Sequence, residues 1–395
     1  MNIKQTCVVV TCFSESQPGY LDFSYRLQAL AKHYQLIILS QDTLTQTELM
    51  VEGANYVAMG RKSGKLGWLT YLNQCASHIR KQQPTLAVLL HSSASPISLI
   101  VGKIPTCLYW NEHPSNLVHL VKGVSPIRNS LAKMAHWLIF FGAKHSNLVM
   151  PIGEHHHEDL IRHGVPAAKI KLVYMGVADY FMQAHSSQQT PENKPIHLMY
   201  IGTVSQARGR DVMLEAMAIL AKETLLLKTS NALKLTIVGA TETELAFCRQ
   251  RAKLLKIDQF VHVVGRVSGH EIPAYLAQAD IGICLWEPNH WNEFNPPTKL
   301  FEYLVAGIPV LASNIRTHTR YINDWQNGLI FDYDAKSLAH AIFQLHSNKH
   351  QLPAFKHHAV MSGKQYVWSK IEPMFLEAIQ DLIASKQENY SVNNL

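Results

Sequence analysis

The sequence predicts an α/β protein with two domains, each built on a parallel sheet with helices on both faces. The chain has 395 residues, which is too long for one ordinary core and suits two. Short apolar runs recur along it, and helical patterns such as 211–224 and 271–279 lie between them. Apolar runs without polar alternation are typical of strands buried on both faces, so we expect parallel strands joined by right-handed crossovers.

The apolar runs form two sets, one in each half of the chain. The expected strands are 7–11, 36–40, 86–90, 106–110, 147–151 and 171–174 in the first half, and 197–202, 234–239, 261–265, 281–286, 309–313 and 328–331 in the second. Residues 183–194 are polar and have the composition of a linker. The expected boundaries are 1–180 for the first domain, 181–195 for the linker, 196–364 for the second domain, and 365–388 for a last helix that packs back on the first domain.

The composition is that of a folded protein without a membrane span. Hydrophobic residues make up 47% and charged residues 16%, which argues against disorder. Residues 1–5 lack the features of a signal peptide, and no apolar window reaches the length of a spanning helix. The six cysteines show no Cys-x-x-Cys pairing, so we expect buried free thiols and a cytoplasmic location. We expect no metal site, since the consecutive histidines of 154–158 do not share one helix face.

The excess positive charge lies in the first half of the chain. Residues 1–175 contain 16 Lys and Arg against 9 Asp and Glu, whereas residues 176–395 contain 20 of each. This asymmetry indicates either an anionic partner, such as a membrane surface or an acceptor, or a solubilising basic surface. Segment 117–143 mixes basic, aromatic and aliphatic residues, as in an interfacial element or a core-facing helix. Nucleic acid is not expected as a partner.

The stretch with the clearest chemistry is 295–313, Asn-Pro-Pro-Thr-Lys-Leu-Phe-Glu-Tyr-Leu-Val-Ala-Gly-Ile-Pro-Val-Leu-Ala-Ser. It predicts a short helix capped by Asn295 and ended by Gly307, followed by a buried strand. Lys299 in the first turns and the helix N-terminus together form an anion site. Glu302 lies one turn further on the same face, where a carboxylate can accept both hydroxyls of a ribose. The alternative is a plain surface Lys–Glu pair.

This stretch resembles the Pro-x-Lys-x-Phe-Glu-Tyr-Leu-Ala-x-Gly-x-Pro-Val motif of glycosyltransferase family 4. Upstream, Arg208-Gly209 matches the family's Lys-Gly or Arg-Gly, which supplies a cation to the donor diphosphate. Close similarity extends over about residues 196–332. The resemblance implies the GT-B architecture, with two facing Rossmann-like domains and a C-terminal crossover helix. It implies a donor site in the second domain, in which the motif glutamate binds the donor ribose.

The resemblance also assigns individual residues. Segment 261–267 is similar to the loop that contacts the nucleotide base, and 104–113 to an acceptor-domain strand that ends in a histidine. Either Glu112 or His113 is then the candidate catalytic residue, which orients the acceptor or the donor sugar. The candidate donor-binding residues are Arg208, Lys299, Glu302, Gly202, Thr203, Arg266 and Thr298.

Four positions depart from the family pattern. Residues 17–20 replace the usual Gly-Gly of the first loop. Thr203 replaces an arginine that often follows the glycine of the first strand in the second half. Met175 stands for the hinge asparagine, and Phe294 stands at the first glutamate of the Glu-x7-Glu pair. The first departure weakens any assignment of donor contacts to the first domain.

The function implied by the resemblance is hexosyl transfer from a nucleotide-diphosphate sugar to a glycan or glycolipid acceptor, with retention and with no cofactor or metal. Cell-surface polysaccharide or glycoconjugate synthesis is the expected process, with peripheral attachment to the inner face of the membrane as a further expectation. One alternative is a nucleotide-sugar epimerase of the same fold, which would consume free donor without an acceptor. The other is a non-catalytic nucleotide-sugar-binding partner protein.

Overall fold

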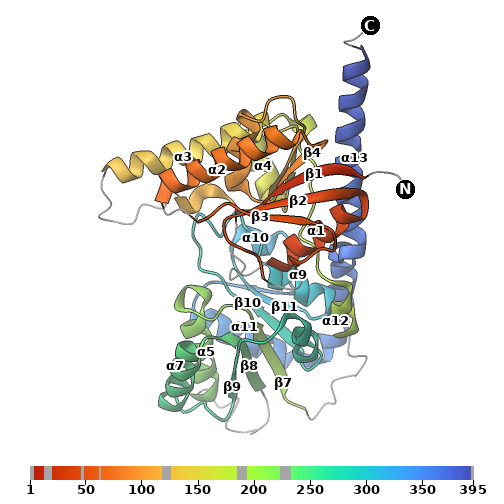
Figure 1. The fold of residues 1–395 in the computed structure, drawn as a ribbon. Helices are drawn as coiled ribbons and strands as arrows, with labels where there is room; N and C mark the ends of the chain where they lie inside the picture. Colours follow the sequence, from red (N-terminus) through yellow and green to blue (C-terminus); the bar gives the residue numbers. More distant parts are fainter. Residues whose placement is uncertain are drawn as a thin grey trace. The chain divides into compact units, whose positions relative to one another are not determined.

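The structure is a computed structural model that describes residues 4–12, 20–45, 49–61, 64–117, 126–184, 194–222 and 233–392. The chain forms two compact units, one of Met1–Gly176 with Trp368–Leu395 and one of Val177–Val367. Each contains a six-stranded sheet with helices around it (Figure 1). Segment 17–19 and residues 185–193 of the expected linker lie outside the described residues.

The sheet of the first unit has the strand order β3-β2-β1-β4-β5-β6, and all neighbouring strands are parallel. The strands are β1 (Gln5–Val10), β2 (Tyr34–Ser40), β3 (Asn55–Ala58), β4 (Leu86–Leu89), β5 (Thr106–Trp110) and β6 (Leu148–Pro151). The helices are α1 (Tyr20–His33), α2 (Gly64–Gln82), η2 (Ser92–Leu99), η3 (Pro114–Leu117), α3 (Pro126–His145), α4 (Glu154–Arg162), η4 (Ala167–Lys169) and α13 (Trp368–Val392).

The sheet of the second unit has the order β12-β11-β10-β7-β8-β9 and is also parallel throughout. The strands are β7 (Ile196–Ile201), β8 (Leu233–Ala240), β9 (Val261–Gly265), β10 (Ile281–Cys284), β11 (Val310–Ser313) and β12 (Gly328–Phe331). The helices are η5 (Asp179–Ala184), η6 (Gln206–Arg208), α5 (Arg210–Lys222), α7 (Glu242–Leu254), η7 (Gly269–Glu271), α8 (Ile272–Leu276), α9 (Thr298–Val305), α10 (Arg316–Thr319), α11 (Ala335–Ser347), η8 (Lys349–Gln351), α12 (Leu352–Gly363) and η9 (Lys364–Tyr366).

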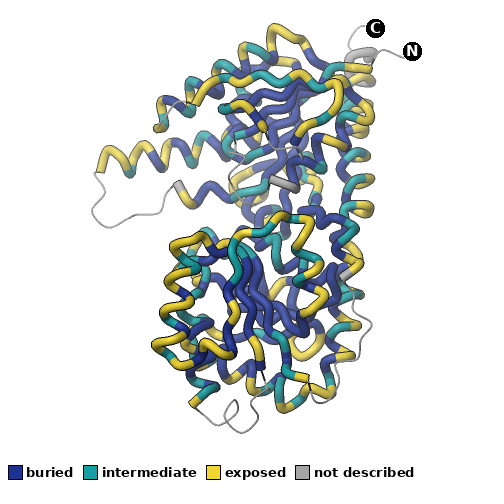
Figure 2. Tube along the Cα trace, turned by 60° about the horizontal axis from the view of Figure 1, so that its bottom comes forward, coloured by how far each residue is buried: buried dark blue, intermediate teal, exposed yellow. Residues whose placement is uncertain are grey.

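Both sheets have the strand order of a doubly wound fold. The order reverses between β1 and β4 in the first unit, and between β7 and β10 in the second. In such sheets, ligands bind outside the carboxyl ends of the strands at this switch point. Figure 2 shows the inner strands of both units as buried. The prediction of two parallel α/β sheets is confirmed.

One expected strand was wrong. Residues 171–174 donate backbone hydrogen bonds to β6 from Lys171 and Val173, but only Ile170 pairs with it, as an isolated bridge. The sixth strand is instead β3, at the edge of the sheet. Its residues are half-buried or exposed, so β3 lacks the continuous apolar run by which the inner strands were recognised.

The expected cap of the motif helix was also wrong. Helix α9 begins at Thr298, and Pro297 precedes it with extended backbone and no side-chain cap. The side-chain amide of Asn295 donates to the carbonyl of Trp291 instead, at 2.8 Å. A residue that precedes proline avoids the helical region, so the two prolines at 296 and 297 delay the start of the helix. Gly307 does follow its end, with a φ of 70°.

Helix α13 belongs to the first unit and packs on α1. Tyr25 contacts the Trp368 ring at a centroid distance of 5.5 Å, and Lys32 forms an ion pair with Glu372. The buried Arg26 pairs with Asp22 and lies 3.9 Å from the centroid of the Tyr109 ring. A desolvated cation is stabilised by a carboxylate and by aromatic faces. Because its carboxylate lies on α1 and its aromatic ring on β5, Arg26 joins these two elements. No helix in the described part of the chain is both long and apolar enough to span a bilayer.

Gly282 in β10 allows α9 to approach the second sheet. A Cβ at this position would lie 2.6 Å from ring atoms of Tyr303. Gly282→Ala should therefore force the ring out of place and destabilise the protein by about 1–3 kcal/mol, the usual cost of overpacking a core. Urea unfolding would measure this cost. Gly265→Ala is the matched control, because the nearest atom to its Cβ is 3.9 Å away; equal effects of the two substitutions would contradict the role of Gly282.

Candidate functional site

The switch point of the second sheet is held together by the hydroxyl of Tyr303, on α9. This hydroxyl accepts the backbone N–H of Ile201 at 2.9 Å and lies 3.2 Å from the carbonyl oxygen of Met199, both in β7. It also lies 3.4 Å from the carbonyl oxygen of Ile283 in β10. The phenol is buried and bonded to both strands, so it fixes α9, with Lys299 and Glu302, at the carboxyl ends of β7 and β10.

Lys299 projects over the end of β7. Its Nζ lies 3.7 Å from the centroid of the Tyr200 ring. A Cβ on Gly202 would lie 3.1 Å from the same Nζ, and Gly202 has a φ of 126°. The aromatic face partly compensates for the lost hydration of the ammonium group. The glycine leaves the room that the lysine occupies, so Gly202 shapes the site by what it lacks.

Arg208 approaches the same region from η6, directly after β7. Its guanidinium carbon lies 4.1 Å from the centroid of the Trp286 ring and 5.7 Å from that of Trp291. Gly209 is left-handed, with a φ of 76°, and a Cβ there would collide with the Leu285 side chain. The glycine therefore lets the chain turn tightly against β10 and place the arginine on the indole rings.

The loop after β10 carries both tryptophans and is fixed by hydrogen bonds. The backbone N–H of Trp286 donates to Ser313 Oγ at 3.0 Å, and Ser313 Oγ donates to the Trp286 carbonyl at 2.9 Å. The side-chain amide of Asn292 donates to the Glu287 carbonyl at 2.7 Å, and the backbone carbonyl of Asn292 accepts from Thr317 Oγ1 at 2.7 Å. The rings that contact Arg208 are therefore held in place before any ligand arrives.

Several buried polar atoms around Arg208 have no hydrogen-bond partner among the described residues. They are Arg208 Nη1, Trp286 Nε1, Trp291 Nε1 and Asn292 Oδ1. Buried polar groups are normally satisfied, and each exception needs an explanation. Three of the four are donors, so the group that would complete them is rich in acceptor oxygens.

Burial shifts the ionisation of the two charged residues on α9. It lowers the pKa of the Lys299 ammonium from 10.5 to about 8 and raises the pKa of the Glu302 carboxyl from 4.5 to about 7. The charge of Arg208 also lowers the pKa of Lys299. No ion pair joins either α9 side chain to another residue in the described part of the chain. The two cations are therefore desolvated and close enough to repel each other, an arrangement that an anion would relieve.

The remaining donor-site candidates lie around this centre or away from it. Thr298 is the half-buried first residue of α9, and Thr203 is exposed, with its carbonyl accepting from Tyr200 Oη at 2.7 Å. Arg266 is exposed and follows β9, which β8 separates from β7 in the sheet. The structure thus brings together Arg208, Lys299 and Gly202, with Glu302 on the same helix, and does not bring Arg266 to them.

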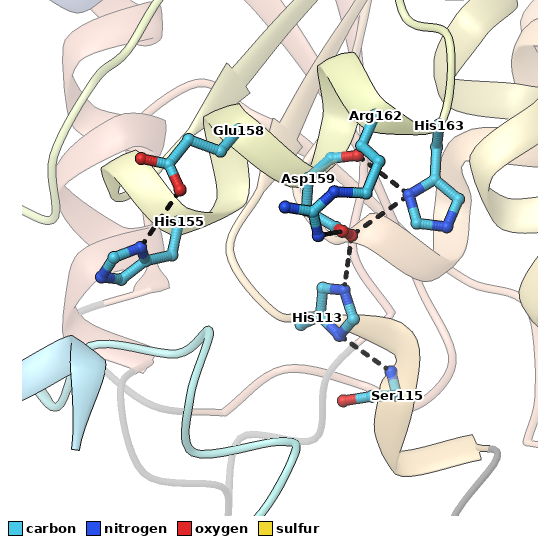
Figure 3. Close-up of polar contacts among 7 residues, drawn as sticks. All are labelled: His113, Ser115, His155, Glu158, Asp159, Arg162 and His163. Carbon is cyan, nitrogen blue, oxygen red and sulfur yellow. Dashed lines mark hydrogen bonds and ion pairs between the residues drawn. The ribbon is translucent and has the colours of Figure 1, made fainter.

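In the first unit, His113 is buried and both of its ring nitrogens are engaged (Figure 3). Its Nδ1 accepts the backbone N–H of Ser115 at 3.2 Å, and its Nε2 lies 2.9 Å from Asp159 Oδ2. The proton therefore resides on Nε2 and is donated to the carboxylate. Burial alone would raise the pKa of Asp159, but hydrogen bonds from His113 and His163 hold it below its usual range. This geometry favours a positioning role for His113, joining the loop after β5 to α4.

Glu112 is more accessible and has a different partner. Its Oε2 lies 3.1 Å from His91 Nε2, and its Oε1 accepts from Asn116 at 2.9 Å. The side chains of Glu112 and His91 are 30% and 16% exposed. His91 directly follows β4, as Glu112 follows β5, and His91 Nδ1 accepts the backbone N–H of Ser93. His91 and Glu112 thus form an accessible pair at the carboxyl ends of β4 and β5, and His91 was not singled out from the sequence.

The architecture is that of the GT-B fold. The chain aligns with sucrose-phosphate synthase from Thermosynechococcus elongatus at a TM-score of 0.73 and 14% identity, covering 97% of this chain and 100% of that one. It aligns with HepE from Anabaena, solved in complex with UDP-glucose, at a TM-score of 0.68 and 13% identity, covering 95% and 100%.

Residues 182–362, in the second unit, match the family model described as "Glycosyl transferases group 1". An uncharacterized 41.2 kDa protein in the cps region of Klebsiella pneumoniae is 22% identical over 212 residues, which are 52% of this chain and 53% of that protein. The putative teichuronic acid biosynthesis glycosyltransferase TuaH of Bacillus subtilis is 32% identical over 69 residues, 18% of this chain and 16% of that protein. The chain thus matches about half the length of the first curated relative, and a smaller part of the second.

The raised pKa of Glu302 predicts that the folding stability of the ligand-free protein falls as the pH rises. The folded state favours the protonated carboxyl, so this group's contribution to stability is present below pH 4.5 and is lost as the pH rises through 7. Glu302→Gln removes the ionisation. The variant should match the wild type at about pH 5 and melt at a higher temperature at about pH 8.

Thermal unfolding at a series of pH values would test this. Glu377→Gln, at an exposed position of α13, is the control and should show no such divergence. A difference between Glu302→Gln and the wild type that stays constant from pH 5 to 8 (about three units) would contradict the desolvated carboxyl.

Proposed function

We propose that the protein is a retaining glycosyltransferase of the family 4 type, which transfers a hexosyl group from a nucleotide-diphosphate sugar to a glycan or glycolipid acceptor. The observation that carries the proposal is the pair of desolvated cations, Arg208 and Lys299, at the switch point of the second sheet, with Glu302 one turn along the same helix. The match to a group 1 glycosyltransferase domain supports the reaction class. The UDP-glucose named for the HepE structure supports the class of donor.

Each charged residue has a separate role in this proposal. The diphosphate oxygens accept from Arg208 Nη1 and Lys299 Nζ and fill the acceptor role that the unpartnered donors lack. Glu302 accepts the ribose hydroxyls. The bond from the anomeric carbon to the diphosphate oxygen breaks with its electron pair going to the diphosphate, so negative charge grows beside the two cations. The acceptor oxygen forms the new bond to the anomeric carbon, and its proton leaves with the diphosphate. Cations fixed before the reaction stabilise this charge without reorganisation, which is the work that a metal ion would otherwise do.

The acceptor side of the proposal assigns Glu112, bonded to His91, to the acceptor hydroxyl. A carboxylate oriented by a histidine and an asparagine is suited to accept a hydrogen bond from such a hydroxyl. The hydrogen bond from His113 to Asp159 then fixes this loop to α4. The relationship to TuaH favours a role in cell-surface polysaccharide or glycoconjugate synthesis.

Glu302→Ala should weaken donor binding while the protein stays folded. Losing a charged acceptor of two hydrogen bonds should cost about 1.5–3 kcal/mol of binding free energy. A thermal-shift panel of nucleotide sugars first identifies the tightest ligand, because binding raises the apparent stability. Calorimetric titration with that ligand then compares the variants. Glu242→Ala, exposed on α7, is the control; equal affinities of the two variants would remove Glu302 from the site.

Arg208→Ala and Lys299→Ala should slow glycosyl transfer more than they weaken binding of the nucleoside alone. Their charges act on a diphosphate whose negative charge grows in the transition state, so each loss should cost roughly a hundredfold in rate. Release of the nucleoside diphosphate, with and without acceptor glycan, is the measurement. Arg251→Ala and Lys253→Ala, on the surface of α7, are the controls.

The same assay separates the proposal from its rivals. If Arg208→Ala and Lys299→Ala each changed the transfer rate by less than threefold (about 0.65 kcal/mol), the chemistry would have to be placed elsewhere. Donor converted to its epimer without acceptor would identify an epimerase, and donor bound but never turned over would identify a binding partner.

A further inference from the structure

Helix α3 exposes a row of large apolar side chains along one face. Its members are Ile127, Leu131, Met134, Trp137 and Phe141, and we call this set the α3 stripe. Ile127 is 74% exposed, Trp137 59% and Met134 54%. Figure 1 shows the N-terminal half of α3 extending past the sheet of its unit, and Figure 2 shows exposed positions along that half. The spacing of four, three, three and four residues places the stripe on a single face.

The other side of α3 is packed against the first unit, so the stripe is not a core face waiting to be covered by it. Ala135, Ile139 and Ala143 are buried. A Cβ on Gly142 would lie 2.4 Å from the backbone of Ser95 in η2, and Ser95 Oγ donates to the Ile139 carbonyl at 2.6 Å. Backbone contact of this kind fixes the rotation of the helix about its axis. The stripe therefore points away from the unit that holds α3.

Positive charge borders the stripe, with no acidic residue on the helix. At about 100° per residue, Lys133 and Lys144 lie beside the stripe on one side and Arg128 lies on the other. All three are exposed, and the sequence has no Asp or Glu between Glu112 and Glu154. A surface that is apolar along its middle and cationic along both sides complements an interface between anionic headgroups and acyl chains.

The N-terminus of α2 adds to the same end of α3. Lys65 Nζ donates to the carbonyl of Arg128 at 3.2 Å, so the two helix starts lie side by side. The neighbouring Leu66 is 81% exposed. Another cation, Lys65, and another exposed aliphatic side chain, Leu66, thus accompany the N-terminal end of the stripe.

We propose that the α3 stripe docks on an anionic lipid bilayer, with α3 lying in the plane of the interface. Trp137 and Phe141, stacked at a centroid distance of 4.9 Å, enter the boundary between headgroups and acyl chains, where aromatic rings are favoured. Lys133 and Lys144 contact the headgroups. A second copy of this chain is a poorer occupant, because a self-complementary contact would bring like charges together with no acidic residue of α3 to pair with them.

Docking of this kind is reversible and selective for charge. The stripe covers about 21 Å of helix, which is enough for interfacial binding and unrelated to spanning. Its strength depends on two separable parts, the apolar area and the electrostatic attraction, and only the second fades with salt. Neither part requires glycosyl transfer or a bound donor, so binding to lipid is measured on the full chain alone.

The test is co-sedimentation of the full chain with vesicles. Phosphatidylcholine vesicles that contain about one third phosphatidylglycerol should bind the wild type, and pure phosphatidylcholine vesicles should bind it about tenfold less. Met134→Ser with Trp137→Ser should lower the partition coefficient about tenfold at any salt concentration. Lys133→Glu with Lys144→Glu should lower it about tenfold at low salt and little at high salt.

The controls are matched substitutions in the second unit, Phe343→Ser and Lys253→Glu, both at exposed positions. They should bind vesicles as the wild type does, and all variants should keep the wild-type melting temperature. Vesicle binding that is equal on neutral and anionic lipid, or unchanged in both stripe variants, would overturn the proposal. A dimer in analytical ultracentrifugation that Trp137→Ser abolishes, without vesicle binding by the wild type, would assign the stripe to a second copy.

Discussion

The hydroxyl of Tyr303 is the contact on which the candidate donor site depends. One buried phenol bonds to β7 and β10 at the point where the strand order reverses. It is accommodated because Gly282 presents no side chain to its ring. The consequence is a helix whose first residues are fixed over the carboxyl ends of the two strands. A ligand at a switch point needs fixed donors on its protein side, and Tyr303 fixes the element that carries two of the charges.

The same site is unfavourable for the free protein. Lys299 and Glu302 have their charged forms disfavoured by burial, with pKa values moved toward each other to about 8 and 7. Arg208 keeps an unpartnered nitrogen against two indole rings. Groups left in this state favour whatever ligand restores their partners. In the first unit the buried Arg26 also has one unpartnered nitrogen, Nε, but its charge is paired with Asp22 and it donates to the Tyr174 carbonyl. The two arginines therefore differ in that Arg26 has a carboxylate partner, whereas Arg208 lies against indole rings.

The sequence predicted those parts of the molecule that local patterns determine. Buried parallel strands appear as apolar runs, and 11 of the 12 expected strands overlap observed ones; the exception, 171–174, is apolar because it packs beside β6 without joining the sheet. The motif placed Lys299 and Glu302 on one helix. It could not reveal that Trp286 and Trp291 flank Arg208, because that contact joins η6 to a loop almost eighty residues later. Nor could it show that Asp159, on α4, is the hydrogen-bond partner of His113 Nε2.

The two units divide their chemistry by charge. At the carboxyl ends of β7 and β10 the second unit gathers cations, which suit a diphosphate. At the carboxyl ends of β4 and β5 the first unit gathers a carboxylate and a histidine, Glu112 and His91, which suit a hydroxyl group. Yet the first unit carries most of the chain's excess positive charge, with 18 Lys and Arg against 13 Asp and Glu, and on α3 that charge lies on the helix surface, beside apolar side chains and away from these strand ends. A basic excess of this kind has no use in holding a neutral hydroxyl. It is explained if the first unit must meet an anionic surface while its strand ends remain suited to the acceptor.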